Sequence, residues 1–228
     1  MGDMTYDEIK SIKSDIVIFI RGVEEFSKKN SRRLSENDKS FFVFLTKRII
    51  FFKYLCPGFD PSKKYFCEVM ISDLYYLITD IIEGNWRYVH VNERSIIENY
   101  TRLLIFSTVE ENHVTLKLIE SLKEKYGETQ LLEDEYSLIK NEYVDSCNYV
   151  HGGELLRDSL ISVFSQMHRK HWDNKKANDY YERFMRMIKI FEKMLLIEYK
   201  SYIDGCFHRR KSLLEYLLGK NAVDALFI

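Results

Sequence analysis

The chain has 228 residues, of which 46% are hydrophobic, so it can bury one substantial core and nothing in its size requires a second domain. The 34 Lys and Arg residues nearly balance 35 Asp and Glu residues, which excludes a global field that would attract nucleic acid or an anionic membrane. Two prolines and nine glycines are too few for the many turns of a β-rich protein. We therefore expect an all-α fold, with residues 1–228 forming a single helical bundle of about eight or nine helices.

The sequence also bears on the compartment. No apolar stretch is long enough to cross a bilayer, and the first residues lack the basic start and apolar run of a secretory signal. The four cysteines show no C-x-x-C spacing, which is typical of reduced and mostly buried thiols. We expect a cytoplasmic protein with no membrane association.

The first half of the chain predicts four helices from apolar residues at helical spacing. Polar residues that can cap a first turn precede most of them, and basic residues, Pro or Gly follow most of them. The expected helices run from Thr5 with Glu8 to the basic stretch Lys28–Arg33, from Ser35 with Asp38 to Cys56-Pro57-Gly58, from Ser62 to Gly84-Asn85, and from Trp86 to about Thr108.

The second half predicts five more helices by the same signals. They cover residues 110–126, residues 131–150, a stretch after Gly152-Gly153 to about Trp172, the longest one from Asp173 or Asn174 to Ile203, and residues 209–218. The end of the chain, Ala225-Leu226-Phe227-Ile228, is apolar. Because an exposed apolar end is unfavourable, we expect the segment from Ala222 onward to form part of a dimer interface.

The helix expected from Trp86 carries charged residues on a largely apolar face. Arg94 and Glu98 are four residues apart, so they share a helix face and can pair. Arg87 lies about two turns earlier on the same face. A buried ion pair is costly, which leaves two interpretations open: an internal clamp that fixes helix register, or a functional site.

The helix expected over residues 131–150 ends at His151, and two glycines follow it. An imidazole near a helix C-terminus is stabilised in its protonated form by the helix dipole, which suits acid–base work near neutral pH. Cys147 lies one turn earlier on the same face, and Ser146 is about 140° round the helix. The alternative is a structural histidine that caps the last carbonyl groups.

Together these stretches resemble the HEPN superfamily, and more closely its uncharacterised bacterial branches, which pair an R-S-x-I-E-N helix with an S-x-x-Y-V-H-G helix. The resemblance covers about Phe66–Arg157 and implies a HEPN-like core over about residues 62–204. The matching residues are Arg94, Ser95, Ile97, Glu98 and Asn99, followed by Ser146, Tyr149, Val150, His151 and Gly152.

The resemblance implies a dimeric helical bundle that acts on RNA in bacterial antiviral defence or a toxin system, by metal-independent cleavage without a cofactor. It implies that His151 is the acid or base, Arg94 the phosphate clamp and Glu98 its orienter. The further candidates are Ser146 as a catalytic hydrogen-bonder, and Arg87, Asn99, Asn148 and Arg157 as RNA- or ligand-binding residues.

The chain departs from the family pattern at one point. HEPN ribonucleases carry an Arg before the His on the same helix, and here the positions with four, five and six intervening residues before His151 hold Ser146, Asp145 and Val144. Either Arg94 supplies the guanidinium from the neighbouring helix, or the hydrolytic site is absent. The alternatives to an enzyme are a non-catalytic module that binds a protein partner or nucleic acid, and a small-ligand sensor. The expected partners are a second copy, RNA, and a cognate antitoxin or defence-system protein.

Other candidate sites carry weaker signals. His168 and His171 are three residues apart, but the flanking Arg169 and Lys170 favour a solvated face over a metal site. Asp73 and Asp80 share a helix face without a partner motif, and P-loop, G-x-G-x-x-G and G-x-S-x-G patterns are absent. Basic clusters suited to RNA phosphates, or simply to a solvated surface, occur at Lys28-Lys29 with Arg32-Arg33, Arg169-Lys170 with Lys175-Lys176, and His208–Lys211.

Overall fold

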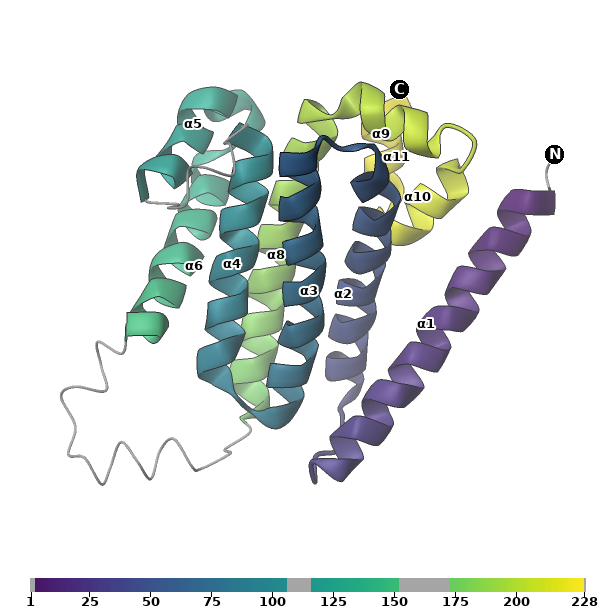
Figure 1. The fold of residues 1–228 in the computed structure, drawn as a ribbon. Helices are drawn as coiled ribbons and strands as arrows, with labels where there is room; N and C mark the ends of the chain where they lie inside the picture. The colour runs from purple at the N-terminus through teal and green to yellow at the C-terminus, as the bar shows by residue number, and fades with distance from the viewer. Residues whose placement is uncertain (1–2, 106–115, 152–172, 228) are drawn as a thin grey trace.

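The computed structural model describes residues 3–105, 116–151 and 173–227, and within these ranges it contains ten α-helices and no strand. The all-α prediction is confirmed (Figure 1). The helices are α1 (Asp3–Lys29), α2 (Glu36–Leu55), α3 (Pro61–Glu83), α4 (Trp86–Ile105), α5 (Leu116–Gln130), α6 (Glu133–His151), α8 (Asn174–Glu198), α9 (Lys200–Phe207), α10 (Lys211–Leu218) and α11 (Lys220–Phe227), and a 3₁₀ turn, η1 (Cys56–Gly58), follows α2.

The long helices run up and down beside one another, and the short C-terminal helices gather at one end (Figure 1). Helix α4 packs against α3, α6, α5 and α8, so it lies in the middle of the bundle. Helix α1 crosses the outside of α2. The two helices that carry the motifs, α4 and α6, are therefore direct neighbours.

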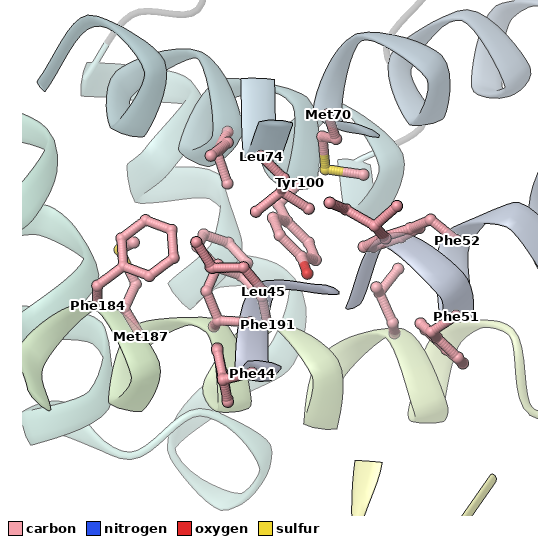
Figure 2. Close-up of a cluster of buried hydrophobic side chains, with 14 of the residues drawn as sticks. Phe44, Leu45, Phe51, Phe52, Met70, Leu74, Tyr100, Phe184, Met187 and Phe191 are labelled. Atoms are coloured by element: carbon pink, nitrogen blue, oxygen red, sulfur yellow. The ribbon is translucent and has the colours of Figure 1, made fainter. Parts of the chain in front are cut away.

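Aromatic side chains fill the centre of the core (Figure 2). The rings of Tyr100 on α4 and Phe191 on α8 stack with centroids 4.7 Å apart, and Phe52 of α2 meets Tyr100 edge-on at 5.4 Å. All three are almost fully buried. Each such side chain stabilises the fold by roughly 1.5–3 kcal/mol through removal from water, so this cluster fixes α4 between α2 and α8.

A buried ion pair joins α2 to α8. The guanidinium of Arg48 donates to both carboxylate oxygens of Glu192, at 2.7 and 3.0 Å, and lies 3.5 Å from the centre of the Phe44 ring. Burial raises the pKa of the Glu192 carboxyl, and Arg48 opposes that shift. The two-pronged geometry satisfies both charges, which is what makes such a pair tolerable inside a core.

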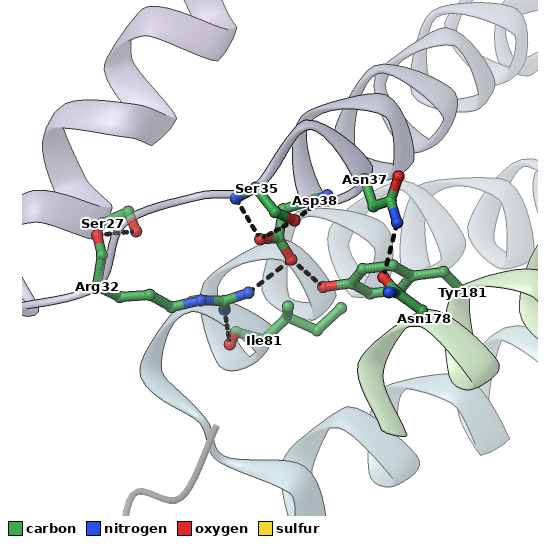
Figure 3. A network of polar contacts seen from close by, with 8 residues as sticks. All are labelled: Ser27, Arg32, Ser35, Asn37, Asp38, Ile81, Asn178 and Tyr181. Carbon is green, nitrogen blue, oxygen red and sulfur yellow. Dashed lines mark hydrogen bonds and ion pairs between the residues drawn. The ribbon is translucent and has the colours of Figure 1, made fainter. Parts of the chain in front are cut away.

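A polar network closes the turn between α1 and α2 (Figure 3). Ser35 caps α2 in a capping box with Asp38, as the sequence predicts. The Asp38 carboxylate also accepts hydrogen bonds from Arg32 at 2.7 Å and from the Tyr181 hydroxyl at 2.6 Å. Arg32 donates further to the carbonyl of Ile81. The turn is thereby fixed to the end of α3 and to α8.

Some helix boundaries differ from prediction. Asp60, not Ser62, caps α3, because Pro61 occupies the first helical position and the Asp60 side chain accepts from the Lys63 amide at 3.0 Å. The longest predicted helix is broken at Tyr199, whose φ of −112° and ψ of 27° are not helical. The Tyr199 hydroxyl donates to the Leu103 carbonyl at 2.5 Å, a tertiary contact that local spacing does not encode. The helix predicted after Gly153 lies outside the described residues.

The apolar end of the chain folds back on its own bundle. Helix α11 packs against α10, α8 and α9, and Ala222 and Leu226 are buried there. The ammonium of Lys211 lies 4.0 Å from the centre of the Phe227 ring. Ala222 and Leu226 therefore cover the chain's own core and are not exposed as expected, whereas the dimer interface itself stays a prediction. Among the described residues, no helix is long and apolar enough to span a membrane.

Candidate functional site

The candidate site lies along the contact between α4 and α6, which we call the seam and define by Arg87, Arg94 and Glu98 of α4 with Tyr143 and Cys147 of α6. The register is antiparallel: Arg87 Nη2 donates to the carbonyl of Val150 at 3.1 Å, and the Arg94 guanidinium lies 5.9 Å from the centre of the Tyr143 ring. Arg94 thus contacts α6 at Tyr143, two turns N-terminal to Val150, which Arg87 contacts.

The predicted pair of Arg94 and Glu98 is present. Arg94 Nε lies 2.8 Å from Glu98 Oε1, and the two side chains keep 28% and 16% of their exposure. Arg102 approaches the other oxygen of Glu98 at 3.8 Å. Partial burial opposes the charge on Arg94, but the hydrogen bond and charge of Glu98 outweigh it and raise the pKa of Arg94. Solvent therefore reaches a guanidinium whose orientation is fixed by a carboxylate.

His151 is the last residue of α6. Its side chain, and all of Arg157, lie outside the described residues. The bond from Arg87 to Val150 fixes the backbone immediately before His151, so the end of α6 is held against α4. The meeting of the His151 imidazole with the Arg94 guanidinium stays a prediction.

The other predicted residues have different surroundings. Ser146 is fully buried, and its hydroxyl donates to the Tyr143 carbonyl at 2.7 Å. Asn99 is also buried, and its amide donates to the Ser95 carbonyl at 2.8 Å and accepts from Arg102. Asn148 is exposed. Ser146 and Asn99 thus satisfy hydrogen bonds within the bundle, and contact with a ligand would require the helices to separate.

A second group of polar residues, which the sequence-based interpretation did not single out, lies between α4, α6 and α8. We call it the buried cluster and define it by His90, Glu93, Glu142 and Arg183. His90 Nδ1 lies 2.8 Å from Glu93 Oε2, and Arg183 Nε lies 2.8 Å from Glu142 Oε1. The side chains of Glu93 and Glu142 are 0% and 4% exposed, whereas that of Arg183 is 47% exposed. Only the arginine connects this cluster to solvent.

Burial dominates the electrostatics of the cluster. It raises the pKa of Glu93 to about 8, against the attraction of Arg183, and the pKa of Glu142 to about 7, with the charge of Glu93 adding to the shift. Burial also lowers the pKa of His90 to about 4. At neutral pH the most favourable arrangement is a neutral Glu93 carboxyl that donates to a neutral His90 imidazole. The cluster can therefore exchange protons near physiological pH.

Aromatic rings enclose the cluster. The Tyr149 ring stacks on His90 with centroids 3.8 Å apart, and Tyr180 meets His90 edge-on at 5.8 Å. The Tyr180 hydroxyl is buried without a hydrogen-bond partner among the described residues. Such groups are uncommon in folded proteins. Because Tyr149 immediately precedes Val150, the cluster and the seam support the same end of α6.

A sequence signal for the cluster does exist. Glu93 is in helical phase with Val89, Ile96 and Tyr100, which are all buried. A glutamate on that apolar stripe indicates a buried carboxyl. The i, i+4 spacing of Arg94 and Glu98 predicts an ion pair on the neighbouring face of α4 instead. The partners of Glu93 on α6 and α8 cannot be predicted from local spacing.

The two aspartates of α3 face α4. Asp80 Oδ2 accepts a hydrogen bond from the Asn92 amide at 2.7 Å. Burial raises the pKa of Asp73 to about 6, and a hydrogen bond from Ser95 opposes that shift. Both aspartates thus join α3 to α4. Within the described ranges, no group of three or more His, Cys, Asp or Glu side chains could hold a metal ion. His168 and His171 lie outside those ranges.

No family model matches the sequence, and neither a curated protein nor a solved structure matches the chain. The function is therefore argued from the residues of the seam and their surroundings.

Proposed function

We propose that the seam acts on RNA and that the protein is a HEPN-like effector of bacterial antiviral defence or a toxin system. The observation that carries the proposal is the Arg94 guanidinium, which Glu98 orients at 2.8 Å while 28% of the side chain stays exposed. A cation that is fixed in direction and reachable from solvent suits a phosphate. It lies on the face of α4 that contacts α6, the helix that ends in His151.

The chemistry proposed is metal-independent cleavage beside a ribose 2′-hydroxyl. A base removes the 2′-hydroxyl proton, the 2′-oxygen attacks the phosphorus, and the 5′-oxygen of the next nucleotide leaves with a proton from an acid. His151 serves as acid or base, and Arg94 stabilises the charge that develops on the phosphate oxygens. A second copy of the chain supplies the second His and Arg. Exposed Asn148 and Arg87 contact the flanking strand.

Cleavage assays with three single variants test this proposal. Total RNA or tRNA is incubated at pH 6 to 8 with EDTA, using the wild type, His151→Ala, Arg94→Ala and Arg186→Ala. Arg186 is the matched control, because it also forms an ion pair, with Asp134, but lies on α8 away from the seam. We expect fragments that end in 2′,3′-cyclic phosphate from the wild type and the control, and intact RNA with the other two. Intact RNA with all four proteins contradicts the proposal.

A second candidate function, a non-catalytic module that binds a protein or a nucleic acid, is favoured by a different observation. The guanidinium groups of Arg87 and Arg94 both already bond within the chain, and Ser146 and Asn99 are buried. If this function is correct, RNA stays intact with the wild type. Arg94→Ala and His151→Ala then change the melting temperature or the affinity for a bound partner, without any change in cleavage.

A further inference from the structure

A basic hollow lies away from the seam, at the turn between α1 and α2. Its volume is about 580 Å³. Its lining includes four cationic side chains, Lys28, Arg32, Arg33 and Lys39, and one acidic side chain, Glu24. This turn contains one of the three basic clusters in the sequence, and the structure gives that cluster a concave shape.

The wall of the hollow is rigid. Ser31 adopts the left-handed conformation with φ of 59°, and the Arg32 amide donates to the Ser27 carbonyl at 3.0 Å, which closes the C-terminus of α1. The Ser27 hydroxyl donates back to the Arg32 carbonyl at 2.8 Å. The Arg32 guanidinium is fixed by Asp38 and by the Ile81 carbonyl (Figure 3). A ligand therefore meets a turn whose backbone is already ordered.

The charges of the hollow do not cancel. Asp38 pairs with Arg32 at 2.7 Å, so this arginine is neutralised. Glu24 and Glu36 pair with Lys39 at 2.8 and 2.9 Å.

The two remaining cations, Lys28 and Arg33, are exposed and form no ion pair among the described residues. Because Lys39 faces two carboxylates, four cations stand against three carboxylates here, and this net positive charge, carried outward by the two unpaired cations, attracts an anion. Arg33 adds a planar fork of donors suited to phosphate oxygens.

We propose that this hollow binds a phosphate group through Lys28 and Arg33. The ligand class is a phosphate-bearing compound, either a free nucleotide or diphosphate, or a nucleotide within an RNA strand. The volume lies within the range of small-molecule sites, and four of the five charged side chains in the lining are cationic, which suits a phosphate group. The site does not depend on catalysis at the seam.

Binding measurements with the full chain test the site. Fluorescence anisotropy with a 5′-labelled twelve-residue oligouridylate compares the wild type with the double variant Lys28→Glu, Arg33→Glu. We expect binding to weaken about tenfold or more, and the dependence of log Kd on log salt to fall by about one per removed cation. The control is Lys10→Glu, Lys117→Glu, which makes the same change of charge at two exposed lysines of α1 and α5 that lie outside the basic clusters. We expect its affinity to stay within about twofold of the wild type.

Competition distinguishes the two sources of phosphate. Displacement of the oligouridylate by inorganic pyrophosphate or UMP at submillimolar concentration identifies a free phosphate ligand, and displacement only by unlabelled RNA identifies the strand. Either result supports the site. Equal loss of binding in both double variants, unchanged binding in the first, or no binding of any probe to the wild type overturns it. If charge reversal impairs folding, the milder double variant Lys28→Gln, Arg33→Gln replaces it and is judged by the same criteria.

Discussion

The seam and the buried cluster begin at adjacent residues of α4 and have opposite surroundings. Arg94 turns toward α6 and solvent, where an i, i+4 carboxylate of its own helix pairs with it. Glu93 turns about 100° away into the bundle, where its neighbours come from α6 and α8 as well as from α4. One helix thus carries a polar face that solvent reaches and another that is enclosed.

The difference shows which polar side chains can exchange a partner within the chain for a ligand. An exposed ion pair contributes at most about 1 kcal/mol to stability, so the fold tolerates a ligand that competes for one partner. A buried carboxyl must keep its partner or its proton, because an unpaired buried charge costs several kcal/mol. This contrast supports the proposal of a functional site at the seam, and the buried cluster supports the end of α6.

The largest expected effect comes from removing a partner inside the buried cluster. His90→Leu removes the hydrogen bond between the imidazole and the buried Glu93 carboxyl, and we expect the free energy of unfolding to fall by about 2–4 kcal/mol. Urea unfolding at pH 7 measures it. The double variant His90→Leu, Glu93→Leu removes both partners and should be more stable than His90→Leu alone. A loss below about 0.5 kcal/mol in the single variant would contradict the enclosed character of the cluster.

The next effect is a pH dependence of stability. The pKa values of Glu93 and Glu142, about 8 and about 7, lie above the ordinary value of 4.5. At a pH between 4.5 and these raised values, folding is therefore accompanied by proton uptake. The stability that these protons contribute is fully present below about pH 4.5 and is lost as pH rises through 7 and 8. We expect the free energy of unfolding to fall by on the order of 4 kcal/mol between pH 6 and pH 9. In Glu93→Gln the free energy of unfolding should fall less steeply with pH. A slope identical to that of the wild type would contradict the assignment of this decline to Glu93.

The third effect concerns the seam, where we expect only a small change in the free energy of unfolding. Arg94→Ala removes a partly exposed ion pair, and we expect less than about 1 kcal/mol of destabilisation by urea unfolding, similar to the control Arg186→Ala. The same variant should lose activity on RNA under the proposed function. A loss of 2 kcal/mol or more would show that Arg94 supports the fold, and the contrast between seam and buried cluster would disappear.

The smallest effect is local. Arg87→Ala removes the donor that holds the Val150 carbonyl, so the last turn of α6 should fray while global stability changes by about 0.5 kcal/mol or less. Hydrogen exchange measured by mass spectrometry should show faster exchange in peptides from the end of α6. Protection there equal to that of the wild type would mean that the buried cluster alone holds this end.

Much of the fold could be predicted from local patterns. The capping box of Ser35 with Asp38 and the left-handed Gly84 that ends α3 are as expected, because capping depends on residues within one turn of each other. The break at Tyr199 and the packing of α11 could not be predicted, because their causes are a distant carbonyl and the surface of other helices. Within the site, the Arg94–Glu98 pair was predictable from spacing, whereas the partnership of Glu93 with α6 and α8 was not.

The sequence by itself determined the helical class, most helix ends and the pairing of side chains four residues apart, since these depend on interactions within a turn or two of one helix. The tertiary structure decided which of two adjacent residues, Glu93 or Arg94, is enclosed and which is reached by solvent. Burial and pKa depend on atoms brought from α6 and α8, about 50 and 90 residues away along the chain. The chemistry available to each polar face follows from that packing.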